Sequence, residues 1–319
     1  MNSRFHSSGL AKLSAVLVLT VIAARAIAAS PFQTGDILYT DSFGAVFRLN
    51  AATGERTTLA SGGKLARPYG IALEANGDVL VSDTGAQAII RIKSPTGSQT
   101  VVAAGARLGV PYGIAVDAKG NILVANGESI LRLNPVAGQP VVVSAGGRFG
   151  GSSGHPLAVA VAENGDLIVA SAGSPSEILR VNPRNGVQAL LSQGPYLKNP
   201  QAIAVSSNDV YVTDVATADG NFGVGIVIHL DLSTGIQTLV SSGGNLVGPV
   251  GIAIDQNGQL VIGDPYTINP DSRDLYDGGI IRINPVGGGQ TLIARGQENY
   301  VNPRGIAVFR AIGSVKRSQ

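Results

Sequence analysis

The sequence predicts an all-β fold, a six-bladed β-propeller with four antiparallel strands per blade. One phrase returns along the chain: a proline, a spacer, a small residue, an aliphatic residue and then alanine. Its six copies begin at Pro68, Pro111, Pro156, Pro200, Pro249 and Pro303, so the period is 43 to 54 residues. Each period also holds four short strand-like runs separated by Gly, Asn and Pro turn signals. A period in the forties with four strands per unit indicates a propeller.

The unit 68–105 shows why each strand of a blade is predicted. Residues 70–73 are small and aliphatic, which suits the crowded strand nearest the ring axis, and an Asn-Gly pair then predicts a tight hairpin. Residues 78–83 form the second predicted strand. Residues 89–93 alternate apolar and charged side chains as a third strand with one wetter face, and 100–103 form the fourth after a Pro-Thr-Gly turn.

The other units repeat these features at aligned positions. Second strands end in a polar residue: Asp41, Asp83, Asn126, Ser171, Asp214 and Asp264. Third strands share one basic position: Arg48, Arg91, Arg132, Arg180, His229 and Arg282. We expect the strand-ending side chains, including the replacements Asn126 and Ser171, to accept hydrogen bonds from loop amides. His229 is predicted to be a scaffold residue, because it fills an Arg position.

The two ends of the repeat array predict how the ring closes. The chain enters at a second strand, residues 36–41, and its last recognisable element is a first strand, residues 305–309. The final blade should therefore pair the C-terminal strand with the three N-terminal ones, which leaves no open edge. We expect one propeller domain over residues 29–310, followed by a basic tail over 311–319.

The N-terminus predicts export. Arg4 and Lys12 precede an apolar run at 13–24 and a small-residue stretch, so residues 1–28 read as a signal peptide. The run is shorter than the ~20 residues that span a bilayer, and with no cysteine there is no lipid-anchored form, so no stable membrane anchor is expected. Residues 29–319 carry a net charge of −1. That near-neutral body gives no general electrostatic reason to bind nucleic acid. We expect a periplasmic or secreted monomer.

The repeat resembles the NHL-repeat family of six-bladed propellers. The Pro-x-Gly-Ile-Ala phrase, the Asn-Gly or Asp-Gly hairpin and the strand-ending Asp carry this resemblance over essentially the whole chain after residue 28. Related six-bladed propellers include gluconolactonase-like and strictosidine-synthase-like enzymes, virginiamycin B lyase-like proteins, peptide-amidating lyases and plain binding modules. The resemblance therefore implies the fold and leaves the function open.

Departures from the repeat mark candidate functional residues. The loops between second and third strands are longest at 216–225 and 265–278, in neighbouring blades, and long loops on one face of a rigid scaffold often carry function. They suggest two ligand-binding tyrosines, Tyr266 and Tyr276. Carboxylates in or beside these loops could supply oxygen ligands for Ca²⁺ or Mg²⁺: Asp214, Asp264, Asp271, Asp274 and Asp277. A tolerated, solvated acidic loop is the alternative.

The loops that lead into the first strands are basic and aromatic. Arg67, Arg107 and Arg304 are candidates to bind a carboxylate- or hydroxyl-bearing ligand, beside Tyr69 and Tyr112. Solvated charges with tyrosines packed over the ring are the alternative. His155 has no counterpart in the other units, so it is a candidate for acid–base chemistry, with an incidental loop histidine as the alternative.

These residues predict a binding module whose ligand is a small molecule, peptide, glycan or extracytoplasmic protein. The chain has no cysteine nucleophile, no P-loop and no dinucleotide-binding fingerprint. The alternative is a cation-assisted lyase or lactonase at the mouth of the central channel, with a catalytic proton carrier among His155, Tyr69 and Tyr112. Convergence of these three residues with Asp214 and Asp264 around one pocket would favour the enzyme.

Overall fold

The computed structural model describes residues 32–150, 154–215, 224–267, 277–295 and 302–311. The predicted signal peptide, residues 216–223 and 268–276 of the two long loops, and the tail from 312 onward lie outside the described residues. No helix within the described ranges is long and apolar enough to cross a membrane.

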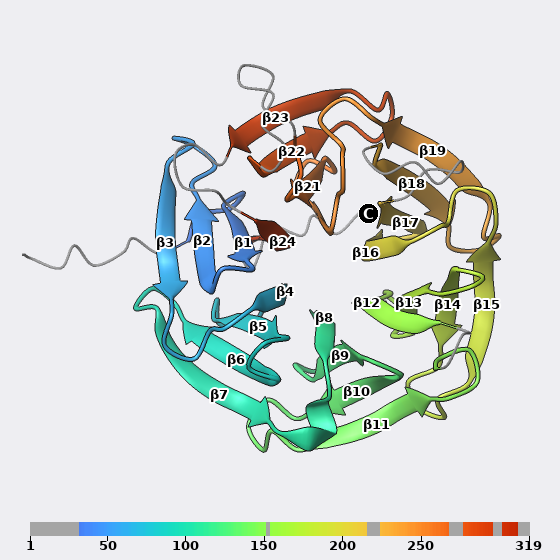
Figure 1. Cartoon of the computed structure of the whole chain (residues 1–319), viewed down its shortest axis with the longest axis horizontal. Coiled ribbons are helices and arrows are strands. Elements are labelled where there is room, and N and C mark those ends of the chain that lie inside the picture. Colours follow the sequence, from blue (N-terminus) through green and yellow to red (C-terminus); the bar gives the residue numbers. More distant parts are fainter. Residues whose placement is uncertain (1–31, 151–153, 216–223, 268–276, 296–301, 312–319) are drawn as a thin grey trace, which may run out of the picture.

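Six four-stranded antiparallel sheets form the blades of a ring (Figure 1), which confirms the predicted fold class. The innermost strands are β24 (Pro303–Val308), β4 (Pro68–Leu73), β8 (Pro111–Val116), β12 (His155–Val161), β16 (Pro200–Ser206) and β20 (Gly251–Ile254). The second strands are β1 (Ile37–Asp41), β5 (Val79–Asp83), β9 (Ile122–Asn126), β13 (Leu167–Ala172), β17 (Asp209–Asp214) and β21 (Leu260–Asp264). The third strands are β2 (Ala45–Leu49), β6 (Ala88–Lys93), β10 (Ser129–Leu133), β14 (Glu177–Val181), β18 (Ile226–Asp231) and β22 (Gly279–Ile283). The outermost strands are β3 (Arg56–Ser61), β7 (Ser98–Ala104), β11 (Pro140–Ala145), β15 (Gln188–Gln193), β19 (Gln237–Ser242) and β23 (Gln290–Arg295), and a short 3-10 helix, η1 (Ala106–Leu108), precedes β8.

The first blade is built from both ends of the chain, as predicted. Strand β24 pairs antiparallel with β1, in the order β24-β1-β2-β3. The Asn302 amide donates to Asp41 Oδ2 at 2.9 Å, and the Gly305 amide donates to Thr40 Oγ1 at 2.8 Å. The strand begins two residues earlier than predicted, because Pro303 already lies opposite Asp41 in the pairing. These contacts close the ring without a covalent link.

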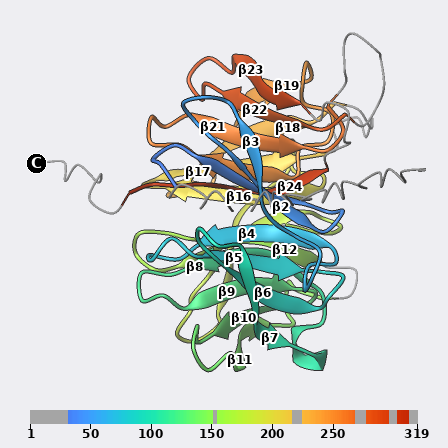
Figure 2. The ribbon, with the colours of Figure 1, turned by 90° about the vertical axis from the view of Figure 1, so that its left-hand side faces the viewer.

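The core lies between the blades, where the sheets pack face to face around the axis (Figure 2). Every residue of β1, β5, β9 and β21 is buried, because a second strand has a neighbouring strand on each side and a neighbouring blade on each face. Burial of each large aliphatic side chain stabilises the fold by about 1.5–3 kcal/mol. Apolar packing therefore holds the ring together in a chain that has no cysteine.

A repeated Gln–Ser–Gly contact joins the outer parts of neighbouring blades. Gln237 Nε2 donates to Ser192 Oγ at 3.0 Å, and Ser192 Oγ donates to the Gly235 carbonyl at 2.7 Å. Two further blade pairs repeat this pattern through Gln188 with Ser144 and Gln290 with Ser241. Each Gln also reaches the loop of the preceding blade, so these hydrogen bonds fix the position of the loops that lead into the first strands.

The shared basic position of the third strands is structural. Arg91 pairs with Glu74 and donates to the Pro135 carbonyl of the next blade, and Arg180 donates to the Leu232 carbonyl of its next blade at 2.7 Å. At the same position, His229 Nε2 lies 2.7 Å from Asp209 Oδ1. The structure thus places His229 within the scaffold, as the alignment of the repeats predicts.

Candidate functional site

The spacer residue of each repeated phrase builds the mouth of the central channel. Pairing between first and second strands slips by one residue at this position, as between Pro68 and Gly70, Pro156 and Ala158, and Pro200 and Ala202. Such a β-bulge redirects a side chain. The six spacers follow one another around the axis in the order Arg304, Tyr69, Tyr112, Leu157, Gln201 and Val250. We call these six residues the mouth ring.

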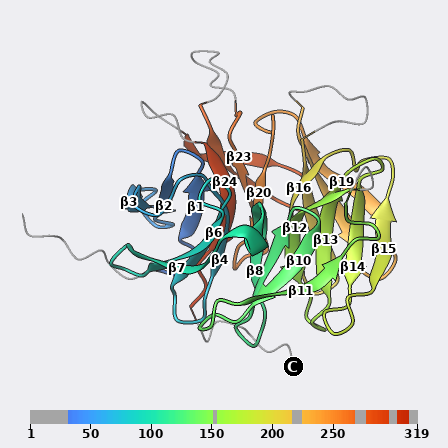
Figure 3. The ribbon, with the colours of Figure 1, turned by 60° about the horizontal axis from the view of Figure 1, so that its bottom comes forward.

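Below the mouth ring, the channel wall is aliphatic. The innermost strands gather around the axis (Figure 3), and the fourth residue of each phrase lines the channel: Ile71, Ile114, Val159, Ile203, Ile252 and Ile306. Each of the six is at most 8% exposed. The cavity measures about 70 Å³, whereas sites for drug-sized ligands measure roughly 300–1,000 Å³. The channel itself therefore has room only for water or a short apolar group.

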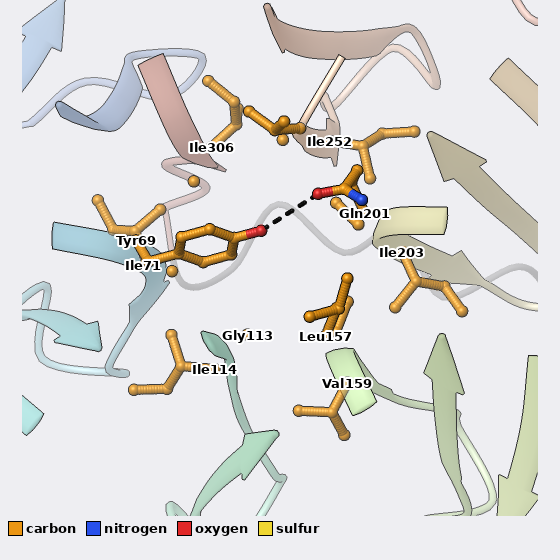
Figure 4. Close-up of a pocket in the computed structure, with 16 residues that line it drawn as sticks. Tyr69, Ile71, Gly113, Ile114, Leu157, Val159, Gln201, Ile203, Ile252 and Ile306 are labelled. Atoms are coloured by element: carbon orange, nitrogen blue, oxygen red, sulfur yellow. Dashed lines mark hydrogen bonds between the residues drawn. The ribbon is translucent and has the colours of Figure 1, made fainter. Parts of the chain in front are cut away.

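One side-chain contact crosses the axis (Figure 4). Tyr69 Oη donates to Gln201 Oε1 at 3.4 Å, and the two residues belong to opposite blades. Gln201 is oriented by its own amide group, because Nε2 donates to the Asn199 carbonyl at 3.1 Å and to Asn199 Oδ1 at 2.8 Å. A 3.4 Å separation makes the Tyr69–Gln201 hydrogen bond weak, so a ligand group can replace it at low cost.

Tyr69 is at the centre of the polar half of the mouth ring. Its ring meets that of Tyr112 edge to face, with centroids 5.3 Å apart. Burial raises the pKa of Tyr69 to about 12, although the nearby Arg304 charge acts in the opposite direction. Tyr112 and Tyr266 are close enough to contribute smaller electrostatic effects. At neutral pH the Tyr69 hydroxyl therefore carries its proton and acts as a hydrogen-bond donor.

Hydroxyl groups of the preceding blades fix the backbone of both mouth-ring tyrosines. Thr40 Oγ1 donates to the Tyr69 carbonyl at 2.6 Å and accepts from the Gly305 amide. Ser82 Oγ donates in the same way to the Tyr112 carbonyl and accepts from the Gly70 amide. The two aromatic positions are therefore held by side chains outside the mouth, which is the arrangement expected of a preorganised site.

The structure brings some of the predicted site residues together and separates others. Tyr69, Tyr112 and Arg304 converge in the mouth ring, and the Tyr266 ring packs beside them against Gly248. Arg67 and Arg107 are exposed on the loops just before the two tyrosine-bearing strands, and His155 is exposed at the start of β12. Asp277 is partly buried before β22, while Asp271, Asp274 and Tyr276 lie outside the described residues.

Asp214 and Asp264 are buried at the ends of second strands and accept hydrogen bonds from backbone amides. Asp214 accepts from the amides of Lys198 and Asn199, and Asp264 from those of Val247, Gly248 and Tyr266, at 2.7–3.2 Å. Within the described ranges, no group of three or more His, Asp and Glu side chains could hold a metal ion. A Ca²⁺ or Mg²⁺ site involving Asp271 and Asp274 stays a prediction.

The strand-ending side chains are predicted to accept hydrogen bonds from loop amides. This prediction holds for the aspartates and is wrong for their replacements Asn126 and Ser171. The side-chain oxygens Asn126 Oδ1 and Ser171 Oγ are buried, and neither has a hydrogen-bond partner among the residues that the structure describes. Ser171 is one bond shorter than the carboxylate it replaces, and Asn126 has only one acceptor oxygen in place of two. Sequence alone showed that these oxygens can accept, but it could not show where the loop amides lie.

Buried Asp264 should make stability depend on pH. Burial raises the pKa of Asp264 from 3.8 to about 6, against the lowering effect of its three backbone hydrogen bonds. Because the folded state holds this proton more tightly than the unfolded state, the group stabilises the fold at low pH, and this effect is lost as pH rises through 6. We expect unfolding free energy, compared with the Asp264→Asn variant, to be about 1.4 kcal/mol greater at pH 5 than at pH 7. Urea unfolding at both pH values measures this difference, and a difference of opposite sign would contradict it.

Two features of this face were missed by the sequence analysis. Gln201 is a spacer of the repeated phrase, but only the bulge geometry shows that its side chain turns toward the axis. Glu177 is 5% exposed and pairs with Arg148, with Arg148 Nη1 2.5 Å from Glu177 Oε1. Alignment of the repeats carried a signal for Glu177, since the other third strands begin with Ala, Ser, Ile or Gly.

Comparisons with known proteins support the fold. No protein-family model matches this chain, and no curated protein matches its sequence. A solved chain from a crystal structure of a nidogen/laminin complex has a similar structure, with a TM-score of 0.69 and 16% sequence identity. The similarity covers 86% of this chain and 98% of that chain. At this identity the likeness shows a shared propeller fold and no more.

Proposed function

We propose that this chain is an exported NHL-type propeller that binds a ligand on the face where its first strands begin. The observation that carries the proposal is the mouth ring, where Tyr69 and Gln201 line the entrance of a narrow aliphatic channel. Tyr112 packs against Tyr69, and Arg304 is close enough to affect the pKa of Tyr69. This partly polar ring suits a protein, a peptide or a glycan, or part of a small molecule. The similar solved chain comes from a complex of nidogen with laminin, which supports a protein or peptide partner.

The placement of the polar groups favours binding over catalysis. The carboxylates of Asp214 and Asp264 accept hydrogen bonds from backbone amides. The exposed His155 side chain belongs to a different blade from Tyr69 and from Tyr112. The backbones of Tyr69 and Tyr112, in contrast, are held by Thr40 and Ser82, and the Tyr69 hydroxyl is a donor engaged only in a weak bond to Gln201. A rigid aromatic surface with few groups to order loses little entropy on binding.

The charge around the mouth suits an anionic or carbonyl-rich ligand. Lys64, Arg67 and Arg107 are exposed on approach loops of this face. Arg148 is engaged with Glu177, so it fixes the loop rather than offering its charge. Arginine side chains at the rim of an interface accelerate association with partners of opposite charge and set their orientation.

Charge reversal on one face tests the proposal. A random peptide library and a glycan array are screened with the wild type, and the affinity of the best binders is then measured for Arg67→Glu/Arg107→Glu. We expect at least a tenfold loss. The control Arg184→Glu changes an exposed arginine in a hairpin on the opposite face, and it should leave affinity unchanged. The absence of any binder, or binders affected only by Arg184→Glu, would contradict the proposal.

A further inference from the structure

We propose that the mouth ring recognises a terminal carboxylate carried on a short aliphatic group, with the carboxylate on Arg304 and the aliphatic group directed into the channel. This inference rests on the proposed function and names the ligand chemistry of the same site. Two sources share that chemistry: a free short-chain carboxylic acid and the C-terminus of a peptide that ends in an aliphatic residue.

Arg304 is oriented, and its two terminal nitrogens have no acidic partner among the described residues. Its Nε donates to Asn302 Oδ1 at 2.8 Å, which fixes the plane of the guanidinium group. No described acidic side chain forms an ion pair with Arg304. The two terminal nitrogens can therefore take both oxygens of one carboxylate, the forked geometry that makes arginine selective for such groups.

One phenol lies near this cation, and a second packs against the first. Tyr69 is within electrostatic range of Arg304, and Tyr112 meets Tyr69 edge to face. Because the Tyr69 hydroxyl keeps its proton, it can donate to a carboxylate oxygen in place of its weak bond to Gln201. The backbone of each tyrosine is fixed by Thr40 or Ser82, so little ordering accompanies binding.

The opposite half of the mouth ring is mostly apolar, and it determines what the carboxylate is attached to. Leu157 and Val250 line the cavity across from the arginine and the tyrosines, and Ile203 and Ile252 continue the wall below them. The cavity of about 70 Å³ admits only a short chain. A ligand with a polar or long body would leave its polar atoms unpaired against this wall or would not enter, and both outcomes cost affinity.

Matched pairs of probes test the inference on the full chain. Isothermal titration compares butyrate with butyramide, and a peptide ending in Gly-Gly-Val with its C-terminally amidated form. We expect each acid to bind at least tenfold more tightly than its amide. Tighter binding of butyrate would assign the site to free acids, and tighter binding of the peptide acid would assign it to C-termini.

Three substitutions test separately the charge of Arg304, the forked geometry of its guanidinium group and the hydroxyl of Tyr69. Arg304→Gln should weaken binding of the acids at least tenfold, Arg304→Lys should give an intermediate loss, and Tyr69→Phe should cost roughly three- to tenfold. Arg184→Gln, which removes an exposed positive charge on the opposite face, should have no effect. Thermal unfolding of each variant confirms that it is folded.

Equal affinity for acid and amide, no saturable binding of either acid, or full affinity in Arg304→Gln would overturn the inference. If that happens while library binders still depend on Arg67 and Arg107, the proposed function stands and only the carboxylate assignment is lost. If neither the acids nor the library members bind, both proposals fail together.

Discussion

Truncation before Pro303 is expected to abolish the folded ring. The truncated chain lacks β24, which pairs with β1 and contributes Ile306, Ala307 and Val308 to the core, each at most 9% exposed. Each large aliphatic residue contributes about 1.5–3 kcal/mol, and each backbone hydrogen bond about 1 kcal/mol. The total approaches the whole stability of a typical domain, about 5–15 kcal/mol. Circular dichroism and urea unfolding should show no cooperative transition.

A shorter truncation provides the control. Removal of residues 312–319 alone keeps the whole of β24, and we expect it to leave the urea midpoint unchanged. A synthetic peptide of residues 302–311, added to the longer truncation, should restore part of the cooperative unfolding. A chain ending at residue 302 that unfolded with the wild-type midpoint would show that the closing strand is dispensable.

Gly251→Ala is expected to destabilise the protein by about 3 kcal/mol, although the change adds only one methyl group. A Cβ atom at position 251 would lie 2.0 Å from the Arg304 carbonyl oxygen and 2.9 Å from Ile306 Cγ1. Because the nearer of these two atoms belongs to the backbone, β20 or β24 must shift where the last blade packs against the first. Urea unfolding measures the loss.

A second glycine serves as the matched control. Gly287 lies in an exposed turn, and a Cβ atom there would meet nothing within 4 Å. Gly287→Ala should therefore change unfolding free energy by no more than about 0.5 kcal/mol. Comparable losses from both substitutions would mean that the general effect of replacing glycine on backbone freedom determines the result. The close approach of β20 to β24 would then not be the cause.

The sequence predicts the blades well because each strand has to satisfy the same packing in six places. The phrase that begins at Pro68 needs a small residue next to the axis, an aliphatic residue facing the channel and a hairpin further along, so its copies keep a recognisable order. Closure followed from the two ends of this pattern. Strand packing and turns depend on residues close together in the sequence, so comparison of the six copies reveals which residues they require.

The site was harder to predict because it depends on contacts between blades. The sequence predicts Tyr69, Tyr112 and Arg304 as site residues of separate loops, and it predicts no role for Gln201. Only the bulges place the four residues in one ring. The sequence leaves two roles open for Asp264, a metal ligand or an acceptor of hydrogen bonds from loop amides. The positions of the Val247 and Gly248 amides decide between them. Sequence spacing carries no information about such distances across the ring.

Closure by β24 also has a kinetic consequence. Most strand pairs join neighbours in the sequence, but the Gly305–Thr40 and Asn302–Asp41 bonds join residues 265 and 261 positions apart. The entropy lost in closing a loop grows only with the logarithm of its length, yet such contacts slow folding because they form after the local ones. The other five blades can assemble while the chain is still being synthesised. The first blade, and with it the arginine of the mouth ring, has to wait for the last strand to emerge.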